Sequence, residues 1–484
     1  MKKIIITLTW GVLSICCLKA QTSSILMGSD FVPQRNYLNP AYFLPNKTVV
    51  VMLPGINAVY NANGSIQDFI FFDKEKKATT VNLNKFMDNL KDGNHIAADI
   101  DINLFGFGFR MLRQKNLFAT FGMEERTRIL SGFPDELRTL LYKGNANYVG
   151  AGNPLVMDDA DFLHATSFMQ WAVGVGYEPV PGLSVGVRAK HLRGILDIST
   201  ANTYMKLTTA DDYSNLSAEL YYQVRTCMPF MRDTSGYQFN KIKAAKGNTG
   251  WAFDIGAEYK VGKWDFSASV LDIGGKINWK KEIYMITPAG KDTSHFSFSG
   301  IDISGYFDDD DTVSSNGGLR DSLRTFLATD TTNGQVANPY ETKLPTRFNL
   351  AVSYQVLPKL KLAASFHGEM DKTLQTHPGC KNETLFFYNA TLMANYKVKN
   401  WLELSLGNTV VSYGSGTRAF NLSYGATLNV AQTLQFYVLI DHLAHTHFLE
   451  AKHASVYYGL NLMMGRGKPA AEASAVGDIL RYQL

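Results

Sequence analysis

Apolar and polar residues alternate over much of the chain, most clearly in residues 163–193. Residues 183–190 place apolar side chains at odd positions and polar or small ones at even positions. A period of two puts these sets on opposite faces of a β-strand, and residues 180–182 are too few to join it to the preceding strand except as a hairpin. The polar face carries Arg188 and Lys190, which favours a water-filled barrel lumen over the core of a soluble sheet.

The same strand–turn–strand unit recurs and allows the strands to be counted. Tight turns fall near Arg113, Pro181, Gly262, Pro358, Asn400 and Gln432. These six turns join twelve strands, and strands over residues 48–60, broken by Pro54, and 453–464 remain at the two ends. Outer-membrane barrels keep short turns on the periplasmic side and long loops outside. The parity therefore predicts an all-β fold, a transmembrane antiparallel β-barrel of about 14 strands with both termini periplasmic.

Two polar stretches, residues 194–250 and 280–343, are too long for tight turns and are predicted to be external loop inserts. The strand-like segments 216–225 and 295–304 fall within them, and counting these as wall strands would change the strand number or break the parity. Short helices are predicted at residues 83–90, 134–143 and 319–327.

The start of the chain has the organisation of a secretory signal peptide, with lysines first, an apolar run over residues 4–18 and small Ala20 before the expected cleavage point. The run is too short to span a bilayer comfortably. Cleavage is favoured over lipidation of Cys16 or Cys17, because the residue before each is not small. The predicted domains are the signal peptide 1–20, an N-terminal leader that could act as a plug 21–47, the outer-membrane barrel 48–464 and a periplasmic C-terminal tail 465–484.

Charge and composition narrow the class further. The whole chain carries a formal charge of +4, and cleavage removes three lysines and no acid, so the mature chain is near +1 and a nucleic-acid partner is excluded. Aromatic residues make up 12% and charged residues 19%, as is typical of an exported barrel in contact with outer-membrane lipid. A secreted array of β-sandwiches is the alternative. Charges of both signs on inward faces and the lack of a fixed repeat disfavour it.

The inward faces of the predicted strands are strongly charged. The lumen-facing candidates are Asp99, Asp101, Arg188, Lys190, Glu258, Glu369 and Glu403.

Two local clusters are candidates for metal ions. His442, His445, His447 and His453 lie in one short external segment, and imidazoles at such spacing could bind zinc or copper. The acidic run 308–311 lacks the alternating ligand spacing of a known calcium loop. Solvated loops without ligand are the favoured interpretation of both, so no metal and no cofactor is predicted.

Cys227 and Cys380 both fall in predicted external loops in an oxidising compartment and are candidates for a disulfide. Two free thiols are the alternative, because sequence alone cannot place the two residues within bonding distance.

The chain lacks the motifs of common enzymes. No Gly-x-Ser-x-Gly or Walker-type loop occurs. Asp441 and His442 are the one close acid–histidine pair, and adjacent strand residues point to opposite faces, so they cannot cooperate in the lumen. We predict that the chain is not an enzyme.

Several short motifs together resemble a known family. Asn39-Pro40-Ala41 after an exported start resembles the segment that opens FadL-like outer-membrane transporters, and residues 183–194 resemble a strand that those barrels share. Residues 271–279 and 458–462 narrow the resemblance to a domain-of-unknown-function family of FadL-like barrels from Bacteroidota. The resemblance extends over most of the mature chain.

The resemblance implies a fourteen-stranded barrel that passes hydrophobic small molecules across the outer membrane, with residues 21–47 as an N-terminal hatch. Such a channel would have a lateral gap in its wall, and Pro54 and Gly274-Gly275 are candidate kinks. Related barrels instead serve as scaffolds in type IX secretion or gliding complexes. A scaffold would have a sealed lumen and would dock other envelope proteins through its external inserts. A plain diffusion pore with an open, charged lumen is the third hypothesis.

Overall fold

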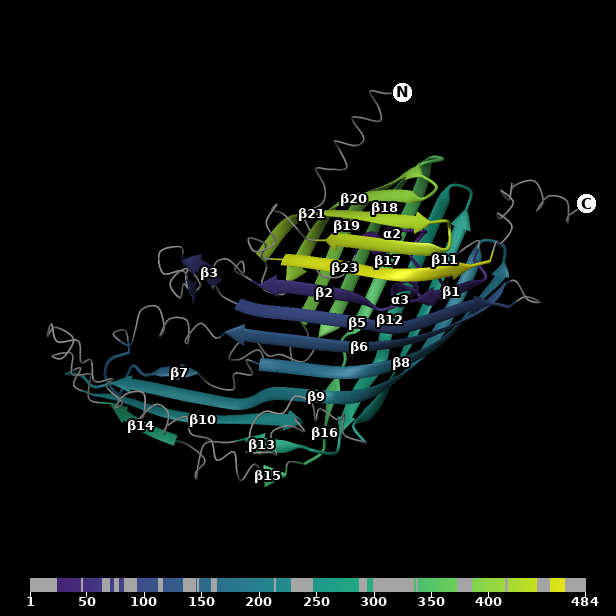
Figure 1. The fold of residues 1–484 in the computed structure, drawn as a ribbon. Helices are drawn as coiled ribbons and strands as arrows, with labels where there is room; N and C mark the ends of the chain where they lie inside the picture. Colours follow the sequence, from purple (N-terminus) through teal and green to yellow (C-terminus); the bar gives the residue numbers. More distant parts are fainter. Residues whose placement is uncertain are drawn as a thin grey trace, which may run out of the picture.

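The wall of the molecule is a ring of antiparallel strands, seen from the side in Figure 1. The computed structural model describes residues 24–44, 47–62, 70–73, 78–81, 94–111, 116–133, 145, 148–157, 163–212, 215–227, 247–286, 294–298, 335–336, 338–371, 385–413, 417–441 and 453–465. The predicted helices at residues 83–90, 134–143 and 319–327 lie outside these ranges. In the part of the chain that is described, no helix has both the length and the apolar character needed to cross a membrane.

The ring is closed and has 14 strands, as the alternation predicted. In order around the wall they are β1 (Val49–Met52) with β2 (Gly55–Ala62), β5 (Asn94–Arg110), β6 (Leu117–Phe133), β8 (Leu163–Val180), β9 (Leu183–Thr209), β11 (Thr249–Val261), β12 (Trp264–Trp279), β17 (Thr346–Leu357), β18 (Leu360–Asp371), β19 (Leu385–Lys399), β20 (Leu402–Tyr413), β21 (Thr417–Val430), β22 (Leu434–Asp441) and β23 (His453–Met464).

The first wall strand closes the barrel. Both β1 and β2 pair with β5 on one side and β23 on the other, so together they form one strand with an interruption at Leu53 and Pro54. Proline has no N–H to donate to the ladder, which explains why the break falls there. The interrupted strand predicted at residues 48–60 is therefore confirmed.

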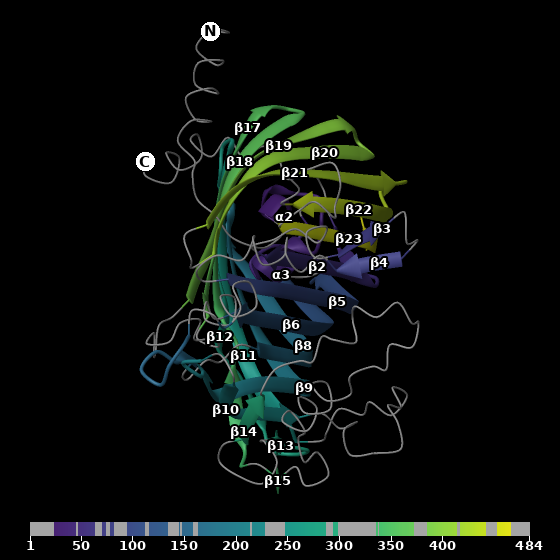
Figure 2. The same ribbon diagram turned by 90° about the vertical axis from the view of Figure 1, so that its left-hand side faces the viewer.

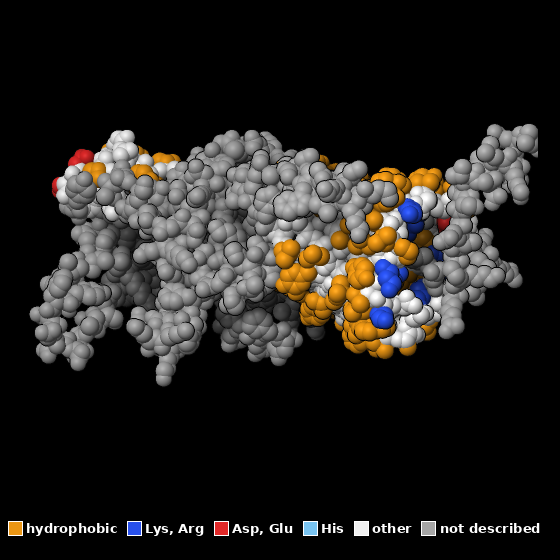
Figure 3. Space-filling model, turned by 90° about the horizontal axis from the view of Figure 1, so that it is seen from above, with side chains coloured by type: hydrophobic (Ala, Val, Ile, Leu, Met, Phe, Trp, Pro, Cys, Tyr) orange, Lys and Arg blue, Asp and Glu red, His pale blue; other side chains and the backbone are white. Residues whose placement is uncertain are grey.

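Burial alternates along the wall strands, with polar side chains inside and apolar ones outside. On β20, Leu404 is 44% exposed whereas the next residue, Ser405, is 7% exposed. Val187, Leu350 and Leu406, from three separate strands, are each more than half exposed. Figure 3 shows hydrophobic side chains over one side of the wall. A barrel with this apolar exterior is built to lie in lipid.

The tight turns lie at one end of the barrel, on the right in Figure 1. Gly182 and Gly262 adopt positive φ in two of them. In the turn between β21 and β22, Ala431 and Gln432 both adopt positive φ, and Thr433 N–H donates to the Val430 carbonyl. This is the type I′ geometry that matches the twist of a hairpin.

At the other end the sheet continues beyond the wall. β9 pairs with β11 as far as Arg193 and then runs on to Thr209, where it pairs with β10 (Leu216–Cys227). Residues 194–250 therefore begin with a strand and contain a hairpin, which differs from a simple loop insert. β10 lies outside the ring, as expected for residues 216–225. Shorter strands complete this region: β7 (Leu155–Met157), β13 (Tyr284–Ile286), β14 (Ser294–Phe298), β15 (Gln335–Val336) and β16 (Tyr340–Lys343); β3 (Ile70–Asp73) and β4 (Ala78–Val81) form a separate hairpin.

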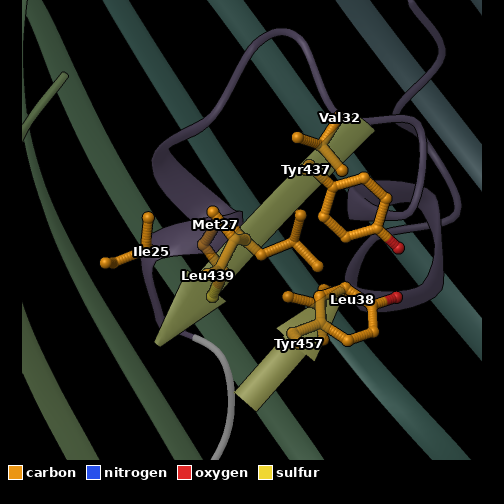
Figure 4. Packing of buried hydrophobic residues seen from close by; sticks show 8 residues of the cluster. Ile25, Met27, Val32, Leu38, Tyr437, Leu439 and Tyr457 are labelled. Atoms are coloured by element: carbon orange, nitrogen blue, oxygen red, sulfur yellow. The ribbon is translucent and has the colours of Figure 1, made fainter. Parts of the chain in front are cut away.

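The leader lies inside the barrel. Its two short helices, α2 (Ser24–Gly28) and α3 (Arg35–Leu38), are enclosed by the ring of strands in Figure 2. Apolar leader side chains pack against Tyr437, Leu439 and Tyr457 of the wall (Figure 4). A second cluster joins residues 42–44 of the leader to wall residues such as Met52 and Phe118. The structure thus gives the segment predicted as a plug its own apolar core within the lumen.

Candidate functional site in the barrel lumen

The Asn-Pro-Ala segment lies against the inner face of β9, β11 and β12. Asn39 Nδ2 donates to Ser267 Oγ at 2.7 Å and to the Ala257 carbonyl at 3.0 Å, while Asn39 Oδ1 accepts from Ala41 N–H at 2.9 Å. A Cβ atom at Gly186 would overlap the Pro40 carbonyl, and one at Gly256 would overlap Asn39 Oδ1. The two strand glycines therefore allow the leader backbone to approach the wall closely.

Arg35 fixes the first half of the leader electrostatically. Arg35 is 2% exposed. Its guanidinium nitrogens lie 2.8 Å from Glu258 Oε1, 3.0 Å from Asp30 Oδ1 and 3.6 Å from Asp265 Oδ2. Lys361 Nζ lies 2.7 Å from the other oxygen of Asp30. Burial alone would raise the pKa of Asp30, but the charges of Lys361, Lys260 and Arg35 hold that pKa below its usual value.

A second ionic group crosses the lumen beyond the leader. Asp272 is fully buried, and its carboxylate lies 2.6 Å from Arg347, 2.7 Å from Lys190 and 3.2 Å from Arg126. Asp254 contacts Lys190 at 2.8 Å and accepts the Asp272 backbone N–H at 2.9 Å. The alternating charges of these strands therefore neutralise one another instead of lining an open pore.

Asp272 occupies an irregular part of the wall. It adopts φ 57°, and Gly274 two residues later adopts φ 63°. On one side of this kink β12 pairs with β17, and on the other it pairs with β16. The kink predicted near Gly274 is therefore present. It is the place where β12 changes partners, opposite Leu344 and Pro345.

Two small cavities lined mostly by polar and charged residues lie in the lumen, each with an open volume of about 50 Å³. The first is lined by the arginines and carboxylates beyond the leader and by Leu344 and Pro345 at the β12 kink. The second lies between Tyr37 of the leader and Arg126, Arg188 and Lys190 of the wall. Cavities of this size and polarity suit a few water molecules better than a hydrocarbon.

A hydrogen-bonded carboxylate lies where β9 leaves β11 and begins to pair with β10. Asp197 is fully buried and accepts from Thr166 at 2.6 Å, Tyr340 at 2.6 Å and Thr342 at 3.2 Å. His164 Nε2 is 3.1 Å from Thr166 Oγ1, but that hydroxyl already donates to Asp197. The group is thus arranged to satisfy a buried charge and not to activate a nucleophile.

The structure places the lumen candidates as follows. Arg188, Lys190, Glu258, Glu369 and Glu403 are all buried. Arg188 donates to the Asn36 carbonyl at 2.5 Å, and Glu403 accepts from Ser29, so both contact the leader. Asp101 lies 3.3 Å from Arg126, and Arg128 lies close to both Asp99 and Glu369.

Sequence reasoning missed Arg35, Asp254 and Asp272. The signal for Arg35 was present, since Asp30 and Arg35 are the two charged residues within 24–44. Asp272 belonged to a family-like motif, but nothing in the motif connected it to Lys190 across the sheet.

The disulfide between Cys227 and Cys380 stays an open alternative, and the histidine segment, for which no metal ion is predicted, lies mostly outside the described residues. His453 begins β23, whereas His442, His445 and His447 lie outside the described residues. Within the described ranges, no group of three or more histidine, cysteine or acidic side chains is arranged to hold a metal ion. Cys227 is a buried free thiol 3.1 Å from Asn248 Nδ2, and burial raises its pKa to about 12. Its candidate partner, Cys380, is outside the described residues.

These features define a membrane-type β-barrel whose lumen is filled by its own N-terminal leader. A family model described as a family of unknown function, DUF5723, matches residues 40–441, and the chain belongs to this family. A comparison with curated proteins finds no match.

Among solved structures, the chain is similar to a Pseudomonas aeruginosa FadL homologue at 9% identity and TM-score 0.45, covering 93% of this chain and 100% of the other. It is similar to the Pseudomonas putida toluene transporter TodX at 8% identity and TM-score 0.42, covering 93% and 99%. The CymD monoaromatic hydrocarbon channel gives 8% identity and TM-score 0.41, covering 92% and 94%.

Proposed function

We propose that this chain is an outer-membrane channel for hydrophobic small molecules and that the leader is its hatch. The observation that carries the proposal is the way in which the leader is held. In the described segment, residues 24–44, the leader makes no strand pairing with the wall and is fixed by side-chain contacts. Such contacts can be broken without opening the ladder of the barrel.

Transport along the barrel axis is closed in this state. An apolar molecule passing the group around Asp272 would have to separate buried ion pairs, which leaves uncompensated charges at high cost. The β12 kink offers a lateral alternative. The first of the two lumen cavities reaches Leu344 and Pro345 at this kink. Movement of the chain there would connect the lumen with the lipid beside the wall.

The hatch is tested by deletion of residues 24–44 with the barrel strands left intact. In planar bilayers the full chain should conduct ions rarely, whereas the deletion variant should form a steady open pore. Gel mobility before and after heating checks that both chains form a folded barrel. If the deletion variant is folded and remains closed, the leader is not the hatch.

The substrate class needs a separate measurement. Cells of a host that lacks its own hydrocarbon channel would be given radiolabelled toluene, with and without the full chain in their outer membrane. Faster uptake with the full chain, lost when the Asp272 kink is replaced by a regular strand, supports the channel. Uptake equal to that of cells without the chain contradicts it.

A scaffold is the second candidate, and the extension of β9 and β10 favours it. The base of this hairpin is held to the wall by a buried cluster in which Cys227 of β10 lies with Leu192 and Trp279, so it forms an ordered surface beyond the barrel. A scaffold predicts that envelope proteins co-purify with the full chain in fixed proportion and are lost when residues 201–226 are replaced by a short turn. Absence of any co-purifying protein would contradict the scaffold.

A further inference from the structure

The outer face of the wall carries an apolar groove of about 510 Å³ over β11, β12, β17 and β18. Its floor consists of Ala257, Ala268 and Ala364, one from each of three strands. Tyr259 and Phe266 border it and are 45% and 44% exposed. Small residues between large ones thus form the groove along the lipid-facing surface. Its volume is within the roughly 300–1,000 Å³ of small-molecule sites.

Two of the three alanines are direct neighbours in the sheet, and β17 lies between them and Ala364. Ala257 is paired with Ala268 between β11 and β12, and Val352 is paired with Ala364 between β17 and β18. Leu350 is the partner of Ala268 and continues the groove onto β17. The groove therefore crosses several strands obliquely, as a flexible chain lying on a tilted sheet would do.

Lysines stand at the short-turn end of the groove. Lys263 and Lys359 are exposed in the turns between β11 and β12 and between β17 and β18. The two turns adjoin, because Gln355 N–H donates to the Lys263 carbonyl at 2.9 Å. Phe266 is three residues from Lys263, about 10 Å along an extended strand. Figure 3 shows Lys and Arg side chains gathered near this end of the hydrophobic surface.

The charge around the groove is of one sign. The carboxylates nearest to it in sequence, Glu258 and Asp265, are buried on the lumen side. The outward positions of the four strands carry no acid among the described residues. The lipid-facing end of the groove therefore offers positive charge with no acid to offset it.

We propose that the groove and the two lysines form a binding site for an anionic glycerophospholipid of the inner leaflet. One acyl chain lies on the alanine floor, and the phosphate is bound by Lys263 and Lys359. A second copy of this chain fits less well, because a twofold contact on this face would bring the same lysines together. The site requires only that the barrel is inserted with its short turns in the periplasm, and it is independent of what the lumen transports.

The test uses the full chain, delipidated in detergent and titrated with phosphatidylglycerol or phosphatidylcholine, with bound lipids counted by native mass spectrometry. Wild type should retain one phosphatidylglycerol in preference to phosphatidylcholine. Changing Lys263→Gln and Lys359→Gln together should weaken retention about 30-fold, at about fivefold to sixfold per lysine. Filling the floor with Ala268→Leu and Ala364→Leu should reduce binding of both lipids.

Matched controls separate the site from general effects of charge and volume. Lys343→Gln removes an exposed lysine far from the short turns, and Ala426→Leu enlarges a lipid-facing alanine on β21. Both should bind as wild type does, and heat-modified gel mobility shows whether each variant is folded. Equal retention of the two lipids by wild type, or equal loss in the controls and in the site variants, would overturn the proposal.

Discussion

Removal of the Arg35 side chain should release the leader from its seat, the position in which it binds the inner face of the wall. The guanidinium is buried among Glu258, Asp30 and Asp265, and loss of one partner of a buried ion pair typically costs about 3–5 kcal/mol. Lys260 lies 3.5 Å from Glu258 and remains to offset part of the exposed charge, which favours the lower end of that range. A loss of about 3 kcal/mol raises the population with an unseated leader roughly 150-fold.

Labelling measures this population directly. Leu38 of α3 is 7% exposed, so a cysteine placed there in an otherwise cysteine-free chain reacts with a water-soluble maleimide when the leader leaves its seat. Arg35→Ala should raise the labelling rate by about two orders of magnitude, while Lys206→Ala, in the hairpin extension, should not change it. Combining Arg35→Met with Glu258→Gln should restore part of the protection, because it removes one of the uncompensated carboxylates. Labelling of Arg35→Ala at the rate of the Lys206 control would show that these ion pairs do not hold the leader.

Three further outcomes are expected. Leu404→Lys should destabilise the folded barrel in lipid by about 2–4 kcal/mol while Ser405→Lys is tolerated, and equal unfolding curves in urea would show that the faces are assigned wrongly. Gly186→Val should push the leader from the wall and give frequent channel openings in planar bilayers, where a conductance like that of wild type would refute the role of the glycine. Cys227 should resist maleimide in native protein carrying Cys380→Ser and react after denaturation; rapid native labelling would contradict its burial and raised pKa.

The wall could be predicted because each wall strand has one apolar and one polar face. Lipid outside and water or ion pairs inside impose a strict period of two, and Pro54 interrupts the first strand where its missing N–H requires. The part of β9 that follows Asp197 was not predicted to be a strand. From Asp197 to Thr209 the strand pairs with β10, and after Ser199 it no longer pairs with the wall strand β8. Its faces are therefore not separated into lipid and lumen, and the alternation is lost.

The lumen was only partly predictable. Sequence shows that Arg188 and Lys190 lie on an inward face, but their partners come from other strands. Asp254 is on β11 and Asp272 is on β12, and only the register of the closed sheet brings them to Lys190. The contacts of Arg35 depend on where the leader lies, and a segment without periodicity carries no information about that position.

The contacts of the leader also set an order on assembly. Gln34 exchanges two hydrogen bonds with Asn461 of the last strand, at 2.7 Å and 3.0 Å, across 427 positions of sequence. The leader is made first and the last part of its binding surface is made last, so a chain still being delivered to the membrane lacks one of the strands that hold the leader. Closure of the ring and occupation of the lumen are thereby linked, because such distant contacts form only after the intervening chain is ordered. A seated leader thus marks a barrel whose final strand has already arrived.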